Sequence, residues 1–231
     1  MGQQKIEQLF SPIKFFITAL LLMGTVACKS TDTTSKQPNK PNSEAELEDL
    51  YWQRIEDSRN SFTNADVKFM TGMIAHHAQA LVMSRLAPQN GASPQIETLT
   101  LRIINAQKDE IKTMQQWLRD RNQPVPKIQI DSLDLTVTIN GEPYTKYRKM
   151  KGVLTQKQIQ ELAEAKDDEF DRLFLTYMIE HHAGAVSMVE NLFATDGAAQ
   201  DEAAFRLASD IQVDQRTEIN RMFEMLNNLP K

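Results

Sequence analysis

Apolar residues recur every three or four positions over most of the chain, a spacing that predicts α-helices. Several of these periodic stretches end just before a proline or a glycine, namely Pro88, Pro124 and Gly197. The predicted helices cover about residues 46–60, 63–87, 93–122, 155–165, 168–193 and 200–229.

Three sites in the sequence have the features of a helix start. Thr63 and Thr155 each precede an acidic or amide residue by three positions, the spacing of a capping box. Ser93 stands directly before Pro94, a cap followed by a proline at the first helical position. These signals support the helix boundaries that the apolar spacing predicts.

Residues 124–152 have a different pattern. Leu133, Leu135, Val137 and Ile139 alternate with polar residues, and Asn140-Gly141 follows, which is typical of a strand that ends in a tight turn. Pro143 argues against a long return strand. We therefore expect an extended arm or small hairpin that lies outside the helical part.

The two helical parts, 46–123 and 153–231, repeat one another. "MIAHHAQALVM" at 73–83 returns as "MIEHHAGAVSM" at 178–188, and "QKDEIKTM" at 107–114 returns as "QRTEINRM" at 215–222. The unit is a pair of helices, and two such pairs predict an all-α fold, a four-helix bundle built by duplication.

The first 27 residues have the pattern of a bacterial signal peptide, with Lys5 and Lys14 ahead of a short apolar run. Cys28, the only cysteine of the chain, follows directly in "TVAC", which predicts lipidation and a lipoprotein anchor. The alternative is an ordinary signal peptide with an incidental cysteine. Residues 28–45 are polar and predict a flexible tether. Together they place the protein in the cell envelope, as a membrane-anchored lipoprotein of the periplasm or outer membrane.

Charge excludes one class of function. The 231 residues carry a net charge of −5, and a mildly acidic chain of this kind is not expected to bind nucleic acid.

The repeated motif holds all four histidines of the protein. At 100° per residue, a helix brings each histidine pair, the small Ala80 or Ala185 and the flanking methionines to one face. We expect that face to point into the bundle. The candidate ligands are Met73, His76, His77, Met83, Met178, His181, His182 and Met188, with Met114 and Met222 from the neighbouring helices less firmly placed.

Imidazole nitrogen and thioether sulfur form a borderline-to-soft set of ligands. Thioether favours Cu(I), and imidazole suits copper in both oxidation states as well as zinc. Magnesium and calcium prefer oxygen and are poor candidates. The sequence therefore predicts copper, with zinc possible, in one site per repeat or in one site shared between the repeats.

Other interpretations remain open at this point. Buried methionines are often core filler, as expected for Met70 and Met225, and a buried histidine is often only hydrogen-bonded. Glu110 and Glu218 are either partners that orient an imidazole or surface charges. Asp66 and Asp171 are expected to start helices rather than to bind metal.

The segments "FMTGMIAHHAQALVM", "AQKDEIKTMQQWL" and "FDRLFLTYMIEHHAGAVSM" resemble the motifs of the domain of unknown function 305 family. The resemblance covers most of residues 62–122 and 150–226. It implies a ferritin-like helical bundle outside the cytoplasm, and one group of members binds copper and supports copper resistance. The arm at 124–149 is longer than the usual linker of the family.

These observations predict a lipid-anchored protein that binds or buffers copper. One alternative is a metal-free helical interaction module of the envelope. A metal-dependent oxidase is the second alternative, but di-iron bundles use Glu-x-x-His pairs, and here no histidine has a glutamate three residues before it. We recognise no catalytic constellation and expect no enzyme.

Overall fold

The computed structural model describes residues 43–230. The predicted signal peptide, Cys28 and most of the predicted tether lie outside the described residues.

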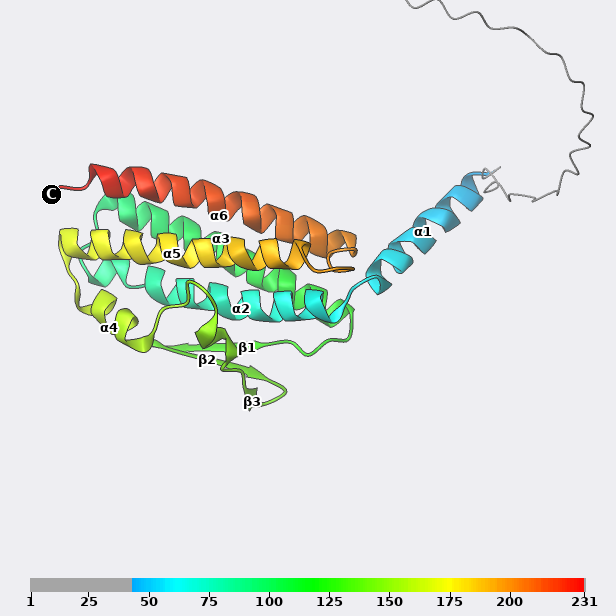
Figure 1. Ribbon diagram of the computed structural model, residues 1–231, viewed down its shortest axis with the longest axis horizontal. Coiled ribbons are helices and arrows are strands. Elements are labelled where there is room, and N and C mark those ends of the chain that lie inside the picture. Colours follow the sequence, from blue (N-terminus) through cyan, green and yellow to red (C-terminus); the bar gives the residue numbers. More distant parts are fainter. Residues whose placement is uncertain (1–42, 231) are drawn as a thin grey trace, which may run out of the picture. The chain divides into compact units, whose positions relative to one another are not determined.

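Six α-helices make up most of this part of the chain (Figure 1). Their bounds are α1 Glu44–Asn60, α2 Asn64–Ser84, α3 Pro94–Asp120, α4 Gln156–Glu164, α5 Asp167–Phe193 and α6 Glu202–Asn228. Short 3₁₀ turns lie at Ala87–Gln89 and Lys146–Lys149. The helices expected from the apolar spacing are all present, and the fold is the predicted helical bundle.

Four long helices form the bundle. Helix α2 packs along α3, α5 packs along α6, and the two hairpins meet where α2 lies against α5. Figure 1 shows α2 and α6 running in one direction and α3 and α5 in the other. Each histidine motif lies in the middle of its helix, on α2 and α5, so this packing brings the two copies together.

The two aspartates at matched positions of the repeats tie the helix pairs to one another. Asp66 completes the capping box with Thr63 and also accepts a hydrogen bond from the Ala199 N–H at 2.7 Å. Asp171 accepts one from the Ser93 N–H at 3.2 Å. Each aspartate therefore holds the loop before a long helix of the other repeat, as well as lying at the start of its own.

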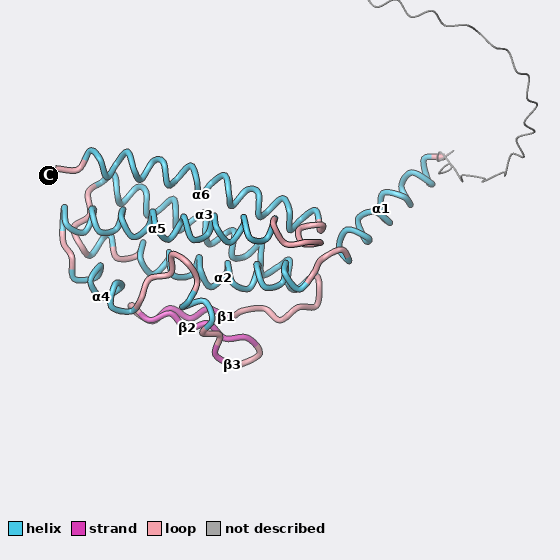
Figure 2. The backbone as a smooth tube through the Cα atoms, in the orientation of Figure 1, coloured by secondary structure: helices cyan, strands magenta, loops and turns pink. Residues whose placement is uncertain are grey.

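The segment between the repeats is a three-stranded antiparallel sheet in the order β1, β2, β3 (Figure 2). Its strands are β1 Lys127–Asp131, β2 Asp134–Ile139 and the two-residue β3 Glu142–Pro143, short as Pro143 predicts. The sheet lies beside the four long helices, yet it is not a detached arm. Leu135, Val137 and Tyr147 are buried in the same apolar cluster as residues of α2, α4 and α5. The alternation along β2 reflects a strand with one face packed on the bundle.

Helix α1 contributes little to the core. Leu47, Leu50, Tyr51 and Trp52 are each between 43% and 58% exposed. The apolar spacing predicted this helix, but several of its large apolar side chains are exposed. Within the part of the chain that is described, no helix combines the length and apolar character that crossing a bilayer requires.

Candidate metal centre

All four histidines are fully buried, although histidine is usually found at intermediate depth. His76 and His77 lie on α2, and His181 and His182 lie on α5. A buried polar ring needs partners to offset its loss of water, so the contacts of each ring nitrogen decide what the cluster can do.

The first histidine of each pair faces its counterpart across the contact between the repeats. The ring centroids of His76 and His181 are 3.9 Å apart, with 45° between the ring planes. His76 Nε2 donates a hydrogen bond to the Lys151 carbonyl oxygen at 3.2 Å. The centre of the bundle is thus a pair of imidazoles contributed by the two repeats.

The second histidine of each pair points to the neighbouring helix of its own repeat. His77 Nε2 is 2.8 Å from Glu110 Oε2 on α3, in ion-pair contact but not in a hydrogen-bonding orientation. His182 Nε2 donates a hydrogen bond to Glu218 Oε2 on α6 at 2.7 Å. Both glutamates are largely buried, so they act as partners of the imidazoles rather than as free surface charges.

The Nδ1 atoms of all four rings, and the Nε2 atoms of His77 and His181, have no hydrogen-bond partner among the described residues. A proton on Nε2, as the Lys151 carbonyl and Glu218 favour, leaves the Nδ1 lone pair free. Buried acceptors without donors are costly in an apolar core, and a metal ion would satisfy them. The residues present therefore fit a metal bound through imidazole nitrogen.

Burial also keeps the two central rings neutral. It lowers the pKa of His76 from 6.5 to about 3, and repulsion from His77 adds to this effect while the Lys151 carbonyl opposes it. Burial likewise lowers the pKa of His181 well below 6.5, with further repulsion from His76, His182 and His77. Neutral imidazole is the form that binds metal, so these rings are ready to act as ligands at neutral pH.

The candidate methionines lie on either side of the histidines. Met73 and Met114 are buried in one apolar cluster, against which Met188 packs. Met83, Met178 and Met222 are buried in the other. Each cluster thus combines methionines of both repeats, because α2 and α5 are antiparallel and the last methionine of one motif lies near the first of the other.

Oxygen and nitrogen ligands alone do not converge. Within residues 43–230, no group of three or more His, Cys, Asp or Glu side chains is arranged to hold a metal ion. The carboxylates of Glu110 and Glu218 are each engaged with one histidine at the edge of the centre. A metal at the centre would therefore draw on the histidine pair and on sulfur.

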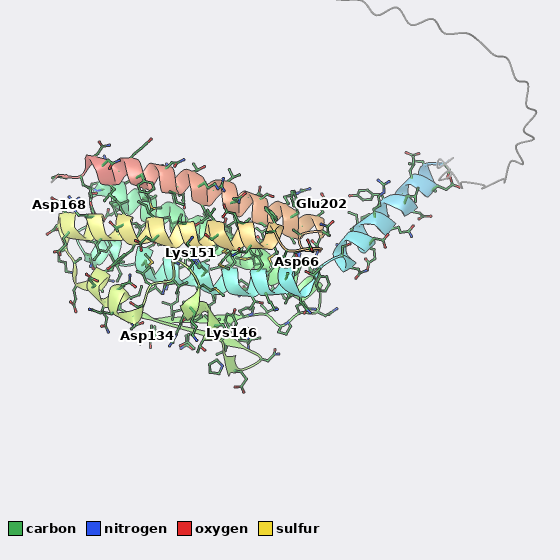
Figure 3. The ribbon with its side chains drawn as sticks, viewed as in Figure 1. Asp66, Asp134, Lys146, Lys151, Asp168 and Glu202 are labelled. Carbon is green, nitrogen blue, oxygen red and sulfur yellow. The ribbon has the colours of Figure 1, made fainter. Side chains whose placement is uncertain are left out.

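The loop before α4 closes one side of the centre, and its contact with His76 has no signal in the sequence motifs. Lys151 supplies a backbone carbonyl, which leaves no side-chain signal, and Figure 3 shows Lys151 beside α2 and α5. Gln79 holds the same loop in both directions, donating to the Leu154 carbonyl at 2.9 Å and accepting from the Leu154 N–H at 2.7 Å. Glycines inside predicted helices, at Gly72 and Gly184, were the available sign of this close approach.

The family described as Domain of unknown function (DUF305) matches residues 66–226, about two thirds of the chain. No curated protein matches the chain significantly.

Solved structures give a similar result. A DUF305 fragment from Deinococcus radiodurans is 27% identical, covers 73% of this chain and 99% of its own, and has a TM-score of 0.59. CopM in its Cu(I)-bound form is 29% identical over 71% of this chain and 96% of its own, with a TM-score of 0.51. Its Cu(II)-bound form is 28% identical with the same coverage and a TM-score of 0.52. None of these descriptions names a catalytic activity.

Proposed function

The chain belongs to the DUF305 family, and from that premise we propose that it binds copper in the core of the bundle, as Cu(I), between its two repeats. The observation that carries this proposal is the set of six buried imidazole nitrogens without a hydrogen-bond partner. CopM, a protein of similar fold, has been solved with Cu(I) and with Cu(II) bound.

The chemistry of the donors favours Cu(I) over other metals. The donors available in the bundle core are the buried imidazoles and the buried thioethers of the apolar clusters on the same helices, and thioether is a soft ligand that selects Cu(I). The fully buried histidines leave no room for the several waters that Mg²⁺ keeps. Zinc shares the imidazole preference but gains little from sulfur in a thioether, and it remains the second candidate.

A single shared site is the simplest arrangement for the histidines. His76 and His181 come from different repeats and lie in ring contact, so one ion between the helices would engage both copies of the motif. Two independent sites would instead require the histidines of each repeat to act separately.

Cu(I) titration of the purified protein tests this arrangement. His76→Gln should abolish most of the tightly bound copper, because a shared site loses one of its two central ligands. Loss of only half of the copper would instead indicate one site per repeat. The readout is bound copper per protein in the presence of a competing Cu(I) chelator.

Met70→Leu is the matched control, because Met70 is a fully buried methionine of α2 that stands outside the repeated motif. It changes the volume little and should leave copper binding unchanged. A protein that holds Cu(I) no more tightly than its His76→Gln variant would overturn the proposal and favour a metal-free interaction module.

The cellular role follows from the predicted leader. We infer that the protein is exported, lipidated at Cys28 and held at the periplasm or outer membrane, where it binds or buffers copper. Stable anchoring by lipid needs more than one acyl chain, which a lipoprotein modification provides. Cys28→Ala should release the protein from the membrane fraction. Unchanged fractionation would remove the anchor from the proposal.

A further inference from the structure

Helix α1 carries an apolar stripe that faces solvent. Leu47, Leu50 and Tyr51 are three and four positions apart, lie on one side of the helix and are all exposed. Acidic residues outnumber basic ones on this helix, with Glu44, Glu46, Glu48, Asp49, Glu56 and Asp57 against Arg54 and Arg59. A helix of this kind can lay its apolar stripe into an apolar groove whose rim is basic.

Such a groove lies between α3 and β1, beside the end of α2. Its floor is apolar and consists of the buried Leu81 and Ile111 and the half-buried Ile128 and Ile130. Its volume of about 350 Å³ is enough for a few large side chains, although not for a whole helix. The groove can therefore receive the stripe of a helix that lies across it.

The rim of this groove is positively charged. It is formed by Arg85, Lys108 and Lys112, which are all exposed. Lys112 is 2.9 Å from Asp109, but both side chains are exposed and solvent weakens their attraction. Among the described residues, neither Arg85 nor Lys108 has an ion-pair partner. The rim thus complements the acidic surface of α1.

The groove lies at the opposite end of α2 from α1. Helix α1 precedes Asn64, the first residue of α2, whereas Leu81 stands about 25 Å further along the helix. Within its own chain, α1 instead places Ile55 beside Trp117 of α3 and Leu207 of α6. Two copies paired antiparallel about a two-fold axis would bring each α1 to the groove of the other copy.

We propose that the protein forms a symmetric dimer in which α1 of each copy docks in the groove between α3 and β1 of the other. The exposed apolar stripe is then covered, and the acidic residues around it meet the basic rim. The family match begins at residue 66, so α1 lies outside it. The dimer is independent of the proposed copper centre, which lies inside each bundle.

A charge swap tests this dimer. The mature chain, with Cys28→Ala in every variant, is studied by sedimentation over a range of concentrations with a metal chelator present. Lys108→Glu with Lys112→Glu, and Glu44→Lys with Glu48→Lys, each place like charges in the interface and should weaken the dimer by about tenfold or more. An equimolar mixture of these two variants should dimerise again, because each α1 then meets a groove of opposite charge.

Two matched controls locate the contact. Lys146→Glu with Lys149→Glu makes the same change of net charge on an exposed turn outside the groove and should leave the dimer intact. Leu50→Gln should weaken the dimer, whereas Trp52→Gln, exposed on another side of α1, should not. A protein that stays monomeric at all concentrations would overturn the proposal. A mixture that does not dimerise, or equal weakening by the Lys146 and Lys149 variant, would overturn it as well.

Discussion

At the scale of single residues, the adjacent histidines of each motif have different tasks. One histidine of each pair meets its counterpart from the other repeat, and the other contacts a glutamate of the neighbouring helix. The helix explains this division, because consecutive residues differ by about 100° in direction and cannot face the same partner. A glutamate on Nε2 raises the basicity of the ring and leaves Nδ1 available to the metal.

Glu218 is accordingly predicted to support copper binding without contacting the metal. Glu218→Gln keeps the shape of the side chain but removes the charge that orients His182, and should weaken Cu(I) affinity by about tenfold. Competition with a Cu(I) chelator measures this change. Glu224→Gln, at an exposed position of α6, should have no effect. Equal affinities of the two variants would show that Glu218 does not contribute to copper binding.

A second residue pair supports the fold away from the metal. Asp201 caps α6, accepts from Trp117 Nε1 at 3.1 Å and pairs with Arg121, all in a buried setting. Asp201→Ala would leave the buried Arg121 charge without its carboxylate partner, which typically costs about 3–5 kcal/mol. Urea unfolding measures this loss. Glu202→Ala, next to it in an exposed position, should cost far less. A small loss in both would mean that water readily reaches Arg121.

At the scale of elements, the glycines show where backbone packs on backbone. In an unconstrained helix, glycine to alanine stabilises by about 1 kcal/mol. At Gly184 the new methyl group would instead collide with the Lys151 carbonyl, a backbone atom that cannot move without the loop. Gly184→Ala is therefore predicted to destabilise the protein by about 1–3 kcal/mol.

Gly72→Ala provides the comparison for Gly184→Ala. Its methyl group would meet the end of the flexible Met150 side chain, which can turn away. Thermal unfolding should therefore show a smaller loss for Gly72→Ala than for Gly184→Ala. Stabilisation by both substitutions would mean that the 150–152 loop does not pack on α5 as described.

The sheet between the repeats is predicted to contribute to stability. Val137 is 2% exposed and belongs to the main apolar cluster, so Val137→Ala should lower the free energy of unfolding by about 1–2 kcal/mol. Thr136→Ala, on the exposed face of the same strand, should change it little. If the two variants unfold at the same urea concentration, the sheet does not contribute to the stability of the bundle.

At the scale of the whole molecule, the duplication explains what could be predicted. Repeated spacing identifies helices, their order and the buried face that carries the histidines, because these depend on residues close in sequence. It does not give the rotation of one helix against another, so the contact of His76 with His181 was not foreseen. The alternation in β2 predicted a strand but not the surface that its apolar face covers.

The buried histidines also make the stability of the metal-free protein depend on pH. Between pH 6.5 and about 3, His76 of the unfolded chain binds a proton that folded His76 does not bind. His181, whose pKa is also lowered by burial, behaves alike over the upper part of that range. The unfolded state therefore binds more protons, and the free energy of unfolding falls as the pH falls, by up to about 1.4 kcal/mol per pH unit for His76, with His181 acting in the same direction.

From pH 6.5 to 5, His76 is thus expected to cost the metal-free protein about 2 kcal/mol in urea unfolding, and His181 adds a loss of the same sign. Histidine NMR should show the ring of His76 still neutral at pH 5, since burial lowers its pKa to about 3 in the folded state. Bound copper should raise the free energy of unfolding by a similar amount across this range without changing its slope, because the metal binds the folded state and the folded His76 ring stays unprotonated there. Protonation of either ring near pH 6, without a fall in the free energy of unfolding, would contradict this expectation. It would mean that water reaches the centre and that burial does not keep the imidazoles neutral.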